Sequence, residues 1–347
     1  MPLSQPSPEV FLSVLLCAHE GGNRDYLREA MESLSKQTLD RDKFEVILIK
    51  DFSDQSISNL AKELGFVQVQ CSHGSLAQKV LAGFRVSRGN VLTLLDYDDR
   101  YVHSRLKKLY EIFLENTKLG YLHDGIECID STGRRSTSGL PLVYWMMMLT
   151  VKRAVVSDAQ KVRTCPRLGF SRPDFHGMTL RRPVFASVLP YLSRIQGTVD
   201  TLLFNGAWIF PLDVGVEPRA LYQYRIHSGG TSFTKTSSME DPNRGSQDWR
   251  ARRRADYGVI REMIRAGERV ELLRDFEFRN YSDDLLELIA SPATRRRDIR
   301  KMASALFNHF FRTNVSPLLI YTLAVLVIFI VSPYISRLLI GSVFRTG

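Results

Sequence analysis

Asn90-Val-Leu-Thr-Leu-Leu-Asp-Tyr-Asp-Asp99 is the stretch that decides the fold, because an apolar run ends there in three carboxylates within four residues. Val91–Leu95 is apolar apart from Thr93, which is typical of a strand buried on both faces of a sheet. Neighbouring carboxylates repel one another and are costly to remove from water unless something cationic lies beside them. Ligands bind at the carboxyl ends of strands in α/β sheets, and Mg²⁺ prefers carboxylate and phosphate oxygens. The stretch therefore predicts a metal site at a strand end, with a solvent-exposed acidic turn as the alternative.

Strand and helix patterns alternate over the first 130 residues. Apolar runs predict buried strands at Phe11–Leu16, Phe44–Ile49, Phe66–Gln70 and Val91–Leu95. Helices are expected between them near Arg24–Lys36, Ser56–Leu64 and Leu76–Val86. A core-packed helix carrying Leu106, Leu109 and Phe113, and then a strand over Tyr121–Ile129, are expected to follow. This alternation predicts an α/β fold with a Rossmann-like, mostly parallel sheet covered by helices on both faces.

The composition is that of a globular protein. The chain has 347 residues, 44% hydrophobic and 24% charged, which is enough for one large or two ordinary domains. Its four cysteines (Cys17, Cys71, Cys128 and Cys165) show no paired spacing, which indicates reduced thiols in a cytosolic setting and no zinc site. The N-terminus lacks the basic region of a signal peptide.

The C-terminal end predicts a membrane anchor. No charged residue occurs in 313–336, and a transmembrane helix needs about 20 predominantly apolar residues. Basic residues are more numerous before this segment than after it, so the large N-terminal part is expected to face the cytoplasm. A buried core helix is the alternative.

A basic amphipathic pattern over Arg296–Phe311 predicts a helix lying in the lipid headgroup layer, or else one packed on the rest of the protein. Residues 241–245 have the composition of a polar linker, and a charged helical region follows over Trp249–Phe276. We therefore expect a catalytic domain in residues 1–240, a charged helical region in 241–312 and an anchor in 313–347. The net charge of +10 fits an anionic membrane surface better than nucleic acid, for which no binding motif is visible.

Five motifs in order resemble the family 2 glycosyltransferases of the GT-A fold. They are Ser13–Glu20, Tyr26–Thr38, Phe44–Asp54, Gly89–Tyr101, and the pair Gly197-Thr-Val-Asp200 and Tyr224-Arg-Ile-His-Ser228. The resemblance covers roughly residues 10–235. It implies an enzyme that moves a sugar from a nucleotide-sugar donor with the help of Mg²⁺ or Mn²⁺.

The resemblance assigns the D-x-D aspartates Asp96 and Asp98 to donor binding through the metal ion. Asp98 is the expected direct ligand, and Asp96 the expected ribose contact. His227 matches a histidine that completes the metal site in some relatives, with a hydrogen-bonded structural histidine as the alternative. The ion would neutralise the diphosphate leaving group.

Four more residues are expected near the nucleotide. By resemblance, Asp51 hydrogen-bonds the nucleobase and His19 stacks on it, whereas the alternative for Asp51 is a helix cap. Lys79 would contact the diphosphate, or it is a solvated helix lysine. Arg225 would support the diphosphate, or it pairs structurally.

Asp200 matches the catalytic base of the family. Inverting transfer needs a carboxylate near the acceptor hydroxyl to take its proton. A helix N-cap before Leu202–Trp208 is the alternative. The segment His176–Arg182 resembles the part of the family that approaches the acceptor.

The chain departs from the family pattern at Lys50 and Phe52, where an acid and a glycine are usual, and at Val199, where an acid precedes the base. The nucleobase pocket is therefore atypical. We expect an inverting glycosyltransferase at the cytoplasmic membrane face whose acceptor is a hydroxyl of a lipid-linked glycan. The alternatives are a polyprenyl-phosphate sugar synthase and a catalytically silent membrane scaffold with the same fold.

Overall fold

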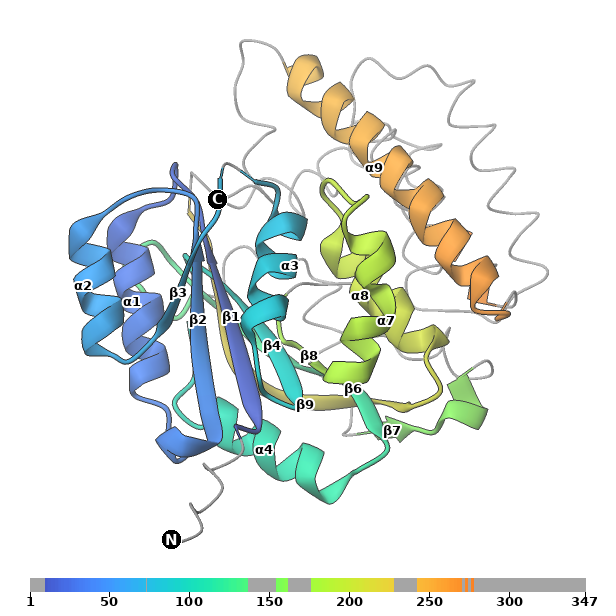
Figure 1. The fold of residues 1–347 in the computed structure, drawn as a ribbon, viewed down its shortest axis with the longest axis horizontal. Helices are drawn as coiled ribbons and strands as arrows, with labels where there is room; N and C mark the ends of the chain where they lie inside the picture. Colours follow the sequence, from blue (N-terminus) through green and yellow to red (C-terminus); the bar gives the residue numbers. More distant parts are fainter. Residues whose placement is uncertain are drawn as a thin grey trace, which may run out of the picture.

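The computed structural model describes residues 10–72, 74–136, 154–161, 176–227, 242–269, 272–273 and 276–277. Its strands form one nine-stranded sheet in the order β3-β2-β1-β4-β8-β6-β9-β5, with β7 paired to β9 (Figure 1). The strands are β1 Leu12–Ala18, β2 Phe44–Lys50, β3 Val67–Gln70, β4 Val91–Asp96, β5 Arg100–Tyr101, β6 Leu119–Ile129, β7 Ala154–Val156, β8 Met178–Arg181 and β9 Asp213–Arg225. The helices are α1 Arg24–Ser35, α2 Gln55–Glu63, α3 Leu76–Val86, α4 Arg105–Glu115, α7 Arg182–Leu192, α8 Val199–Ile209 and α9 Pro242–Ala266.

Six of the nine strands in the described residues run in one direction. β1 pairs in parallel with β2 and β4, β2 with β3, and β6 with β9. β8 runs antiparallel between β4 and β6, and β5 and β7 run antiparallel to β9. The predicted α/β fold with a mostly parallel sheet is confirmed, although the sheet is mixed where the later strands join it.

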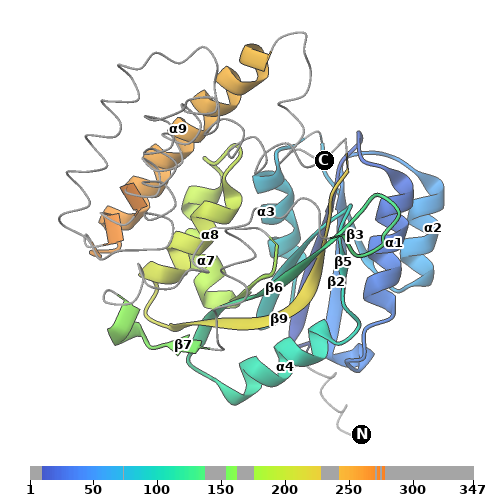
Figure 2. The same ribbon diagram turned by 180° about the vertical axis from the view of Figure 1, so that it is seen from behind.

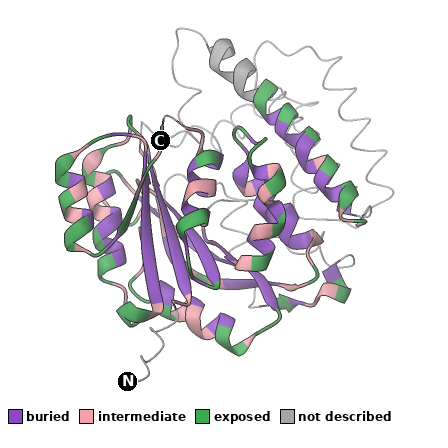
Figure 3. Cartoon of the chain, in the orientation of Figure 1, coloured by how far each residue is buried: buried purple, intermediate pink, exposed green. Residues whose placement is uncertain are grey.

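Helices cover both faces of this sheet (Figures 1 and 2). Successive side chains of a strand point to opposite faces. In β1, Leu15 packs into a core with α3, α7 and α8, whereas Val14 and Leu16 pack into a second core with α1, α2 and α4. The central strands are accordingly buried along their length (Figure 3). This explains why they appear in the sequence as continuous apolar runs.

The helix ends follow local rules. Asp54 is the N-cap of α2 and accepts a hydrogen bond from the Ile57 N–H at 3.1 Å. Gly65 stands just after α2 with φ +67°, a conformation that side chains disfavour and glycine adopts freely. The predicted ends of the first three helices and strands agree with the structure to within two residues.

α9 packs against α7 and α8 on the side away from the sheet (Figure 2). Its apolar residues Ile260, Met263 and Ile264 are buried in the same core as those two helices. The predicted helical region after residue 249 is confirmed over α9, but the predicted polar linker is wrong for residues 242–245, which form the start of α9. Proline is favoured in the first turn of a helix, where its missing N–H is not needed, so Pro242 begins the helix rather than preventing it.

The predicted basic helix at 296–311 and the predicted span at 313–336 lie outside the described residues, so both stay predictions. Within the part of the chain that the structure describes, no helix combines the length and apolarity needed to cross a bilayer. Cys17, Cys71 and Cys128 are free thiols.

Candidate active site

The candidate site lies at the carboxyl edge of the parallel strands. Ala18 at the end of β1 stands beside Lys50 at the end of β2, and Cys17 stands beside Asp96 at the end of β4. The residues that follow these strands, including His19 and Asp51, therefore meet at one edge. Such an edge is where ligands bind in open α/β sheets.

Asp98 and His227 meet at this edge from distant parts of the chain. The Oδ2 atom of Asp98 lies 2.9 Å from Nε2 of His227, which follows the end of β9. Both side chains keep some access to solvent, with exposed fractions of 17% for Asp98 and 9% for His227. The structure thus brings together a carboxylate and an imidazole that the family resemblance assigns to one metal site.

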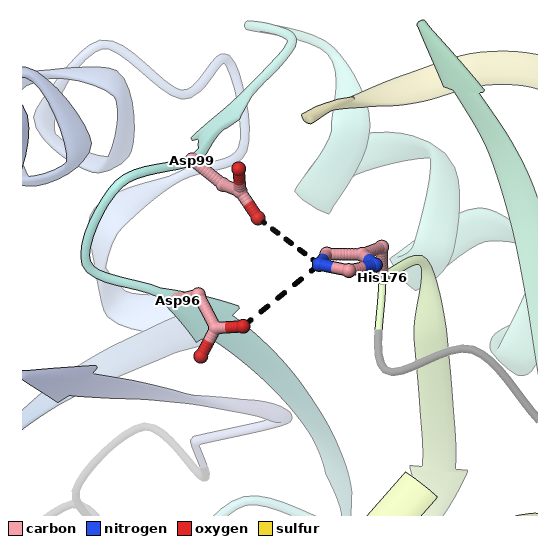
Figure 4. A group of neighbouring side chains, drawn as sticks. All are labelled: Asp96, Asp99 and His176. Atoms are coloured by element: carbon pink, nitrogen blue, oxygen red, sulfur yellow. Dashed lines mark ion pairs between the residues drawn. The ribbon is translucent and has the colours of Figure 1, made fainter. Parts of the chain in front are cut away.

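Asp96 faces a different histidine. Nε2 of His176 lies 3.8 Å from Oδ2 of Asp96 and 3.4 Å from Oδ2 of Asp99 (Figure 4). Ligand atoms of these three residues all lie within 4.8 Å of one another. His176 comes just before β8, and its position beside the D-x-D turn was not predicted from the sequence.

Asp99 is the buried member of the acidic turn. It accepts hydrogen bonds from the Tyr222 hydroxyl at 2.8 Å and from the Arg225 backbone N–H at 2.7 Å. Burial raises its pKa well above the usual range, the charges of Asp98 and Asp96 add to this rise, and His176 opposes it. Asp99 therefore ties the end of β9 to the turn that carries Asp96 and Asp98.

These donors suit a hard divalent cation. Asp96 and Asp98 offer partly exposed carboxylate oxygens, and His227 and His176 offer imidazole nitrogens. Mg²⁺ takes carboxylate and phosphate oxygens, and Mn²⁺ also accepts imidazole. In the described residues, Asp96, Asp99 and His176 are the three candidate ligands whose atoms converge, whereas Asp98 and His227 form a pair of their own.

Arg225 lies behind this turn, with its side chain fully buried. Its guanidinium donates to the backbone oxygen of Asp98 at 2.7 Å and to the carboxylate of Glu29, and it lies 4.3 Å from the ring centroid of Tyr26. Arg225 therefore makes structural contacts within the protein, and its predicted support of the diphosphate stays a prediction.

Asp51 and Lys79 form an ion pair instead of standing apart. Nζ of Lys79 lies 2.7 Å from Oδ2 of Asp51, and Oδ1 of Asp51 accepts the Glu20 N–H at 2.8 Å. Burial favours a higher pKa for Asp51, but the hydrogen bond and charge of Lys79 outweigh it and hold the pKa below its usual value. Two alternatives are wrong, because Asp54 and not Asp51 caps α2, and because Lys79 is buried and not solvated.

His19 lies at the same edge, half-buried. Its ring packs edge-on against Tyr97, with 4.7 Å between the ring centroids. Burial lowers its pKa, and the charge of Lys79 lowers it further, which favours the neutral imidazole. A neutral, partly exposed ring can stack on a base.

The unusual residues Lys50 and Phe52 serve packing. Nζ of Lys50 donates to Oγ of Ser58 in α2 at 2.6 Å. The Arg24 guanidinium lies 3.5 Å from the ring centroid of Phe52 and donates to the Gly22 carbonyl at 2.7 Å. Lys50 therefore contacts α2, and Phe52 packs against the arginine that holds the loop after β1.

Asp200 lies in the first turn of α8. α7 and α8 are neighbouring helices joined by a short turn, and β9 then runs parallel to β6. The start of α8, with Asp200, therefore lies at the edge of the sheet where β4 and β9 end. Oδ1 of Asp200 accepts the Thr201 N–H at 2.6 Å, but the N-cap position belongs to Thr198, so Asp200 is not the N-cap.

Residues 13–175 match the profile of Glycosyl transferase family 2. The matched segment includes His19, Asp51, Lys79 and the D-x-D turn, whereas Asp200 and His227 lie beyond it.

Solved structures with a similar fold include those of an S. aureus protein, TarS. The crystal structure of S. aureus TarS 1–349 in complex with UDP-GlcNAc matches with a TM-score of 0.50 and 15% identity, over 88% of this chain and 74% of that one. S. aureus TarS itself matches with a TM-score of 0.47 and 13% identity, over 87% of this chain and 44% of that one. The chain thus spans less than half of TarS. No curated protein sequence is significantly similar to this chain.

Proposed function

We propose that this protein is an inverting, metal-dependent glycosyltransferase that moves a sugar from a nucleotide-sugar donor to a hydroxyl group. The observation that carries the proposal is the meeting of Asp98 and His227 at 2.9 Å, at the carboxyl edge of the parallel strands in the segment that matches Glycosyl transferase family 2. A divalent ion held by these residues would neutralise the diphosphate as it leaves. The nucleotide would lie along the same edge, where Asp51 and His19 follow β2 and β1.

In the proposed reaction the acceptor oxygen attacks the anomeric carbon of the sugar as the bond to the diphosphate breaks on the opposite side. The carboxylate of Asp200 takes the hydroxyl proton, and the electron pair of the broken bond stays with the diphosphate. A direct displacement of this kind inverts the anomeric configuration. Arg225 and Asp99 keep the D-x-D turn and the end of β9 in register, so that Asp98 and His227 stay together.

We further propose a lipid-linked glycan as acceptor and a location at the cytoplasmic membrane face. The support is the uncharged segment 313–336 with its basic flank, which would hold the site near the bilayer. A polyprenyl-phosphate acceptor needs no base as strong as Asp200, so full activity of Asp200→Asn would favour a polyprenyl-phosphate sugar synthase.

Two steps test the proposal. The first is the thermal unfolding of the purified full chain with UDP, GDP, CDP and dTDP nucleotides and their sugars, with and without Mn²⁺. UDP and UDP-GlcNAc are the first choices because TarS 1–349, of the same fold, was crystallised with each. A ligand that binds only the folded state raises the melting temperature by mass action, by about 2.7 kcal/mol at 100 times its Kd.

A metal-dependent rise with one nucleotide supports the donor site. The second step follows transfer from that donor to lipid-linked acceptors. The absence of a rise with every nucleotide would contradict the enzyme proposal and favour the silent scaffold.

A further inference from the structure

A short loop between α7 and α8, Gln196–Thr198, is fastened by a residue from α9. The carboxylate of Asp256 accepts the backbone N–H of Gln196 at 2.9 Å through Oδ1. Its Oδ2 accepts the N–H groups of Gly197 at 2.8 Å and Thr198 at 2.9 Å, and the Thr198 hydroxyl at 3.0 Å. Asp256 is completely buried. One buried carboxylate therefore satisfies four donors in three consecutive residues.

Asp256 holds the N-cap residue of α8 and the two residues before it. Its carboxylate accepts their backbone N–H groups, and a negative charge at a helix start is favoured by the helix dipole. The Thr198 side chain is the N-cap but makes no capping hydrogen bond, because its hydroxyl donates to Asp256 instead. The partner of this helix start is therefore a residue about 60 positions later in the chain.

The other end of α8 is also held from α9. Nζ of Lys161 donates to the carbonyls of Ala207 at 2.9 Å and Phe210 at 2.6 Å, and it pairs with Asp158 at 3.3 Å. Arg269, just after α9, donates to both oxygens of Asp158 at 2.8 Å. Both ends of the helix that carries Asp200 thus depend on contacts that lead to α9.

We propose that Asp256 is a positioning residue for the proposed base Asp200, and that α9 is part of the catalytic unit. The inference rests on the proposed function, since it concerns the reaction of Asp200. Asp256 holds Thr198, and Asp200 follows two residues later in the first helical turn, so a shift of this loop moves the carboxylate of Asp200. Displacing a catalytic group by about 1 Å lowers turnover by about 100-fold. The nucleotide residues Asp51 and Asp98 come from other elements and stay in place.

The test uses the full chain with Asp256→Asn. This change keeps the size of the side chain, but its amide N–H₂ group cannot accept hydrogen bonds from the backbone N–H groups. We expect kcat to fall by about 100-fold, with the KM for the donor and the Mn²⁺-dependent nucleotide stabilisation unchanged. Glu262→Gln is the matched control, because Glu262 also lies on α9 but forms an exposed pair with Arg194. Its kcat should equal that of the wild type.

A double variant with Asp200→Asn distinguishes the loss of positioning from a general loss of stability. In an Asp200→Asn background, Asp256→Asn should lower kcat by less than threefold, because the base that it positions is already absent. An unchanged kcat in the single variant, a parallel loss of nucleotide binding, or additive losses in the double variant would overturn the proposal. Should Asp256→Asn not fold, Thr198→Val removes one of the four donors, and kcat should fall by about tenfold at constant donor KM.

Amide hydrogen exchange gives a readout that needs no turnover. Protection of Gln196–Thr198 should be lost in Asp256→Asn and kept in Glu262→Gln. Retained protection would overturn the positioning role, whether or not the enzyme proposal holds. Conversely, wild-type protein without transfer activity, or full activity of Asp200→Asn, would contradict the proposed function. The hydrogen-exchange result for the loop could still be interpreted, because it does not depend on activity.

Discussion

A buried ion pair beneath the active-site edge gives the sharpest prediction about stability. Arg105 donates to Asp124 through Nε at 2.6 Å and through Nη2 at 3.0 Å, and neither side chain is exposed to solvent. The guanidinium also donates to the Thr93 hydroxyl at 2.8 Å and lies 4.0 Å from the ring centroid of Tyr101. The pair joins α4 to β6 and reaches β4 at Thr93, three residues before Asp96.

The magnitude follows from this geometry. Each hydrogen bond to a charged group contributes about 1.5–3 kcal/mol, and removing one partner of a buried pair costs about 3–5 kcal/mol, because the other charge is left uncompensated. Asp124→Asn keeps one carbonyl acceptor and should lower the free energy of unfolding by about 3 kcal/mol. Asp124→Ala keeps none and should lower it by about 5 kcal/mol. Either loss is a large part of the roughly 5–15 kcal/mol that stabilises a native protein.

Urea unfolding followed by circular dichroism measures these losses. In the double variant Arg105→Met with Asp124→Asn, no charge remains buried, so the loss should be at least about 1.5 kcal/mol smaller than the sum of the two single losses. Glu262→Gln, which removes only an exposed pair, should leave the unfolding midpoint unchanged. A loss under about 1 kcal/mol in Asp124→Asn, or additive losses in the double variant, would refute the reasoning.

Three further predictions concern the site and its support. Asp98→Asn should lower kcat at least about 100-fold while leaving the melting temperature of the free protein unchanged, because the ion would lose a charged ligand; retained turnover would contradict the metal assignment. Asp200→Asn should lower kcat about 10²- to 10⁴-fold at constant donor KM, as loss of a general base does, and steady-state kinetics measure both. Burial lowers the pKa of Lys161 from 10.5 to about 8, and Asp158 opposes this. Between these two values the unfolded chain keeps a proton that the folded chain has released, so the stability contributed by Lys161 rises as the pH rises from about 8 to 10.5. The difference in melting temperature between the wild type and Lys161→Met should therefore increase as the pH rises from about 8 to 10.5. A difference that does not change with pH would contradict the lowered pKa of Lys161.

The first half of the fold could be predicted from the sequence because parallel strands buried on both faces leave continuous apolar runs. β4 and α3 agree with the predicted ranges to within one residue. β7, of three residues, is too short to show a period, and the sequence pattern predicted neither β8 nor the 13-residue β9. The polar residues and Gly245 at the start of α9 resemble a linker, and the apolar contacts of α9 with α8 are made by residues from Tyr257 onward, which no local pattern at 242–245 shows.

In the candidate site too, the sequence predicts the residues that have a local signal and misses the contacts between distant residues. Asp96 and Asp98 follow directly from a strand that ends in acids, which is a local signal. The Asp51–Lys79 ion pair and the hydrogen bond from Arg225 to Asp99 join residues that are far apart in sequence, and local sequence patterns do not predict such contacts. His176 was singled out from the sequence only as the start of the segment 176–182. Its place beside Asp96 depends on β8 lying next to β4, and this strand order is not visible in the sequence.

The acidic turn raised the question of how three carboxylates within four residues are accommodated, and the structure answers it by giving each one a different environment. Asp98 lies beside His227, Asp96 keeps access to solvent near His176, and Asp99 is buried with two hydrogen-bond donors and a raised pKa. The two hydrogen bonds that Asp99 accepts, from the Tyr222 hydroxyl and the Arg225 N–H, tie the turn to β9. The buried third acid therefore closes the turn, while the carboxylates of Asp96 and Asp98 keep access to solvent at the sheet edge.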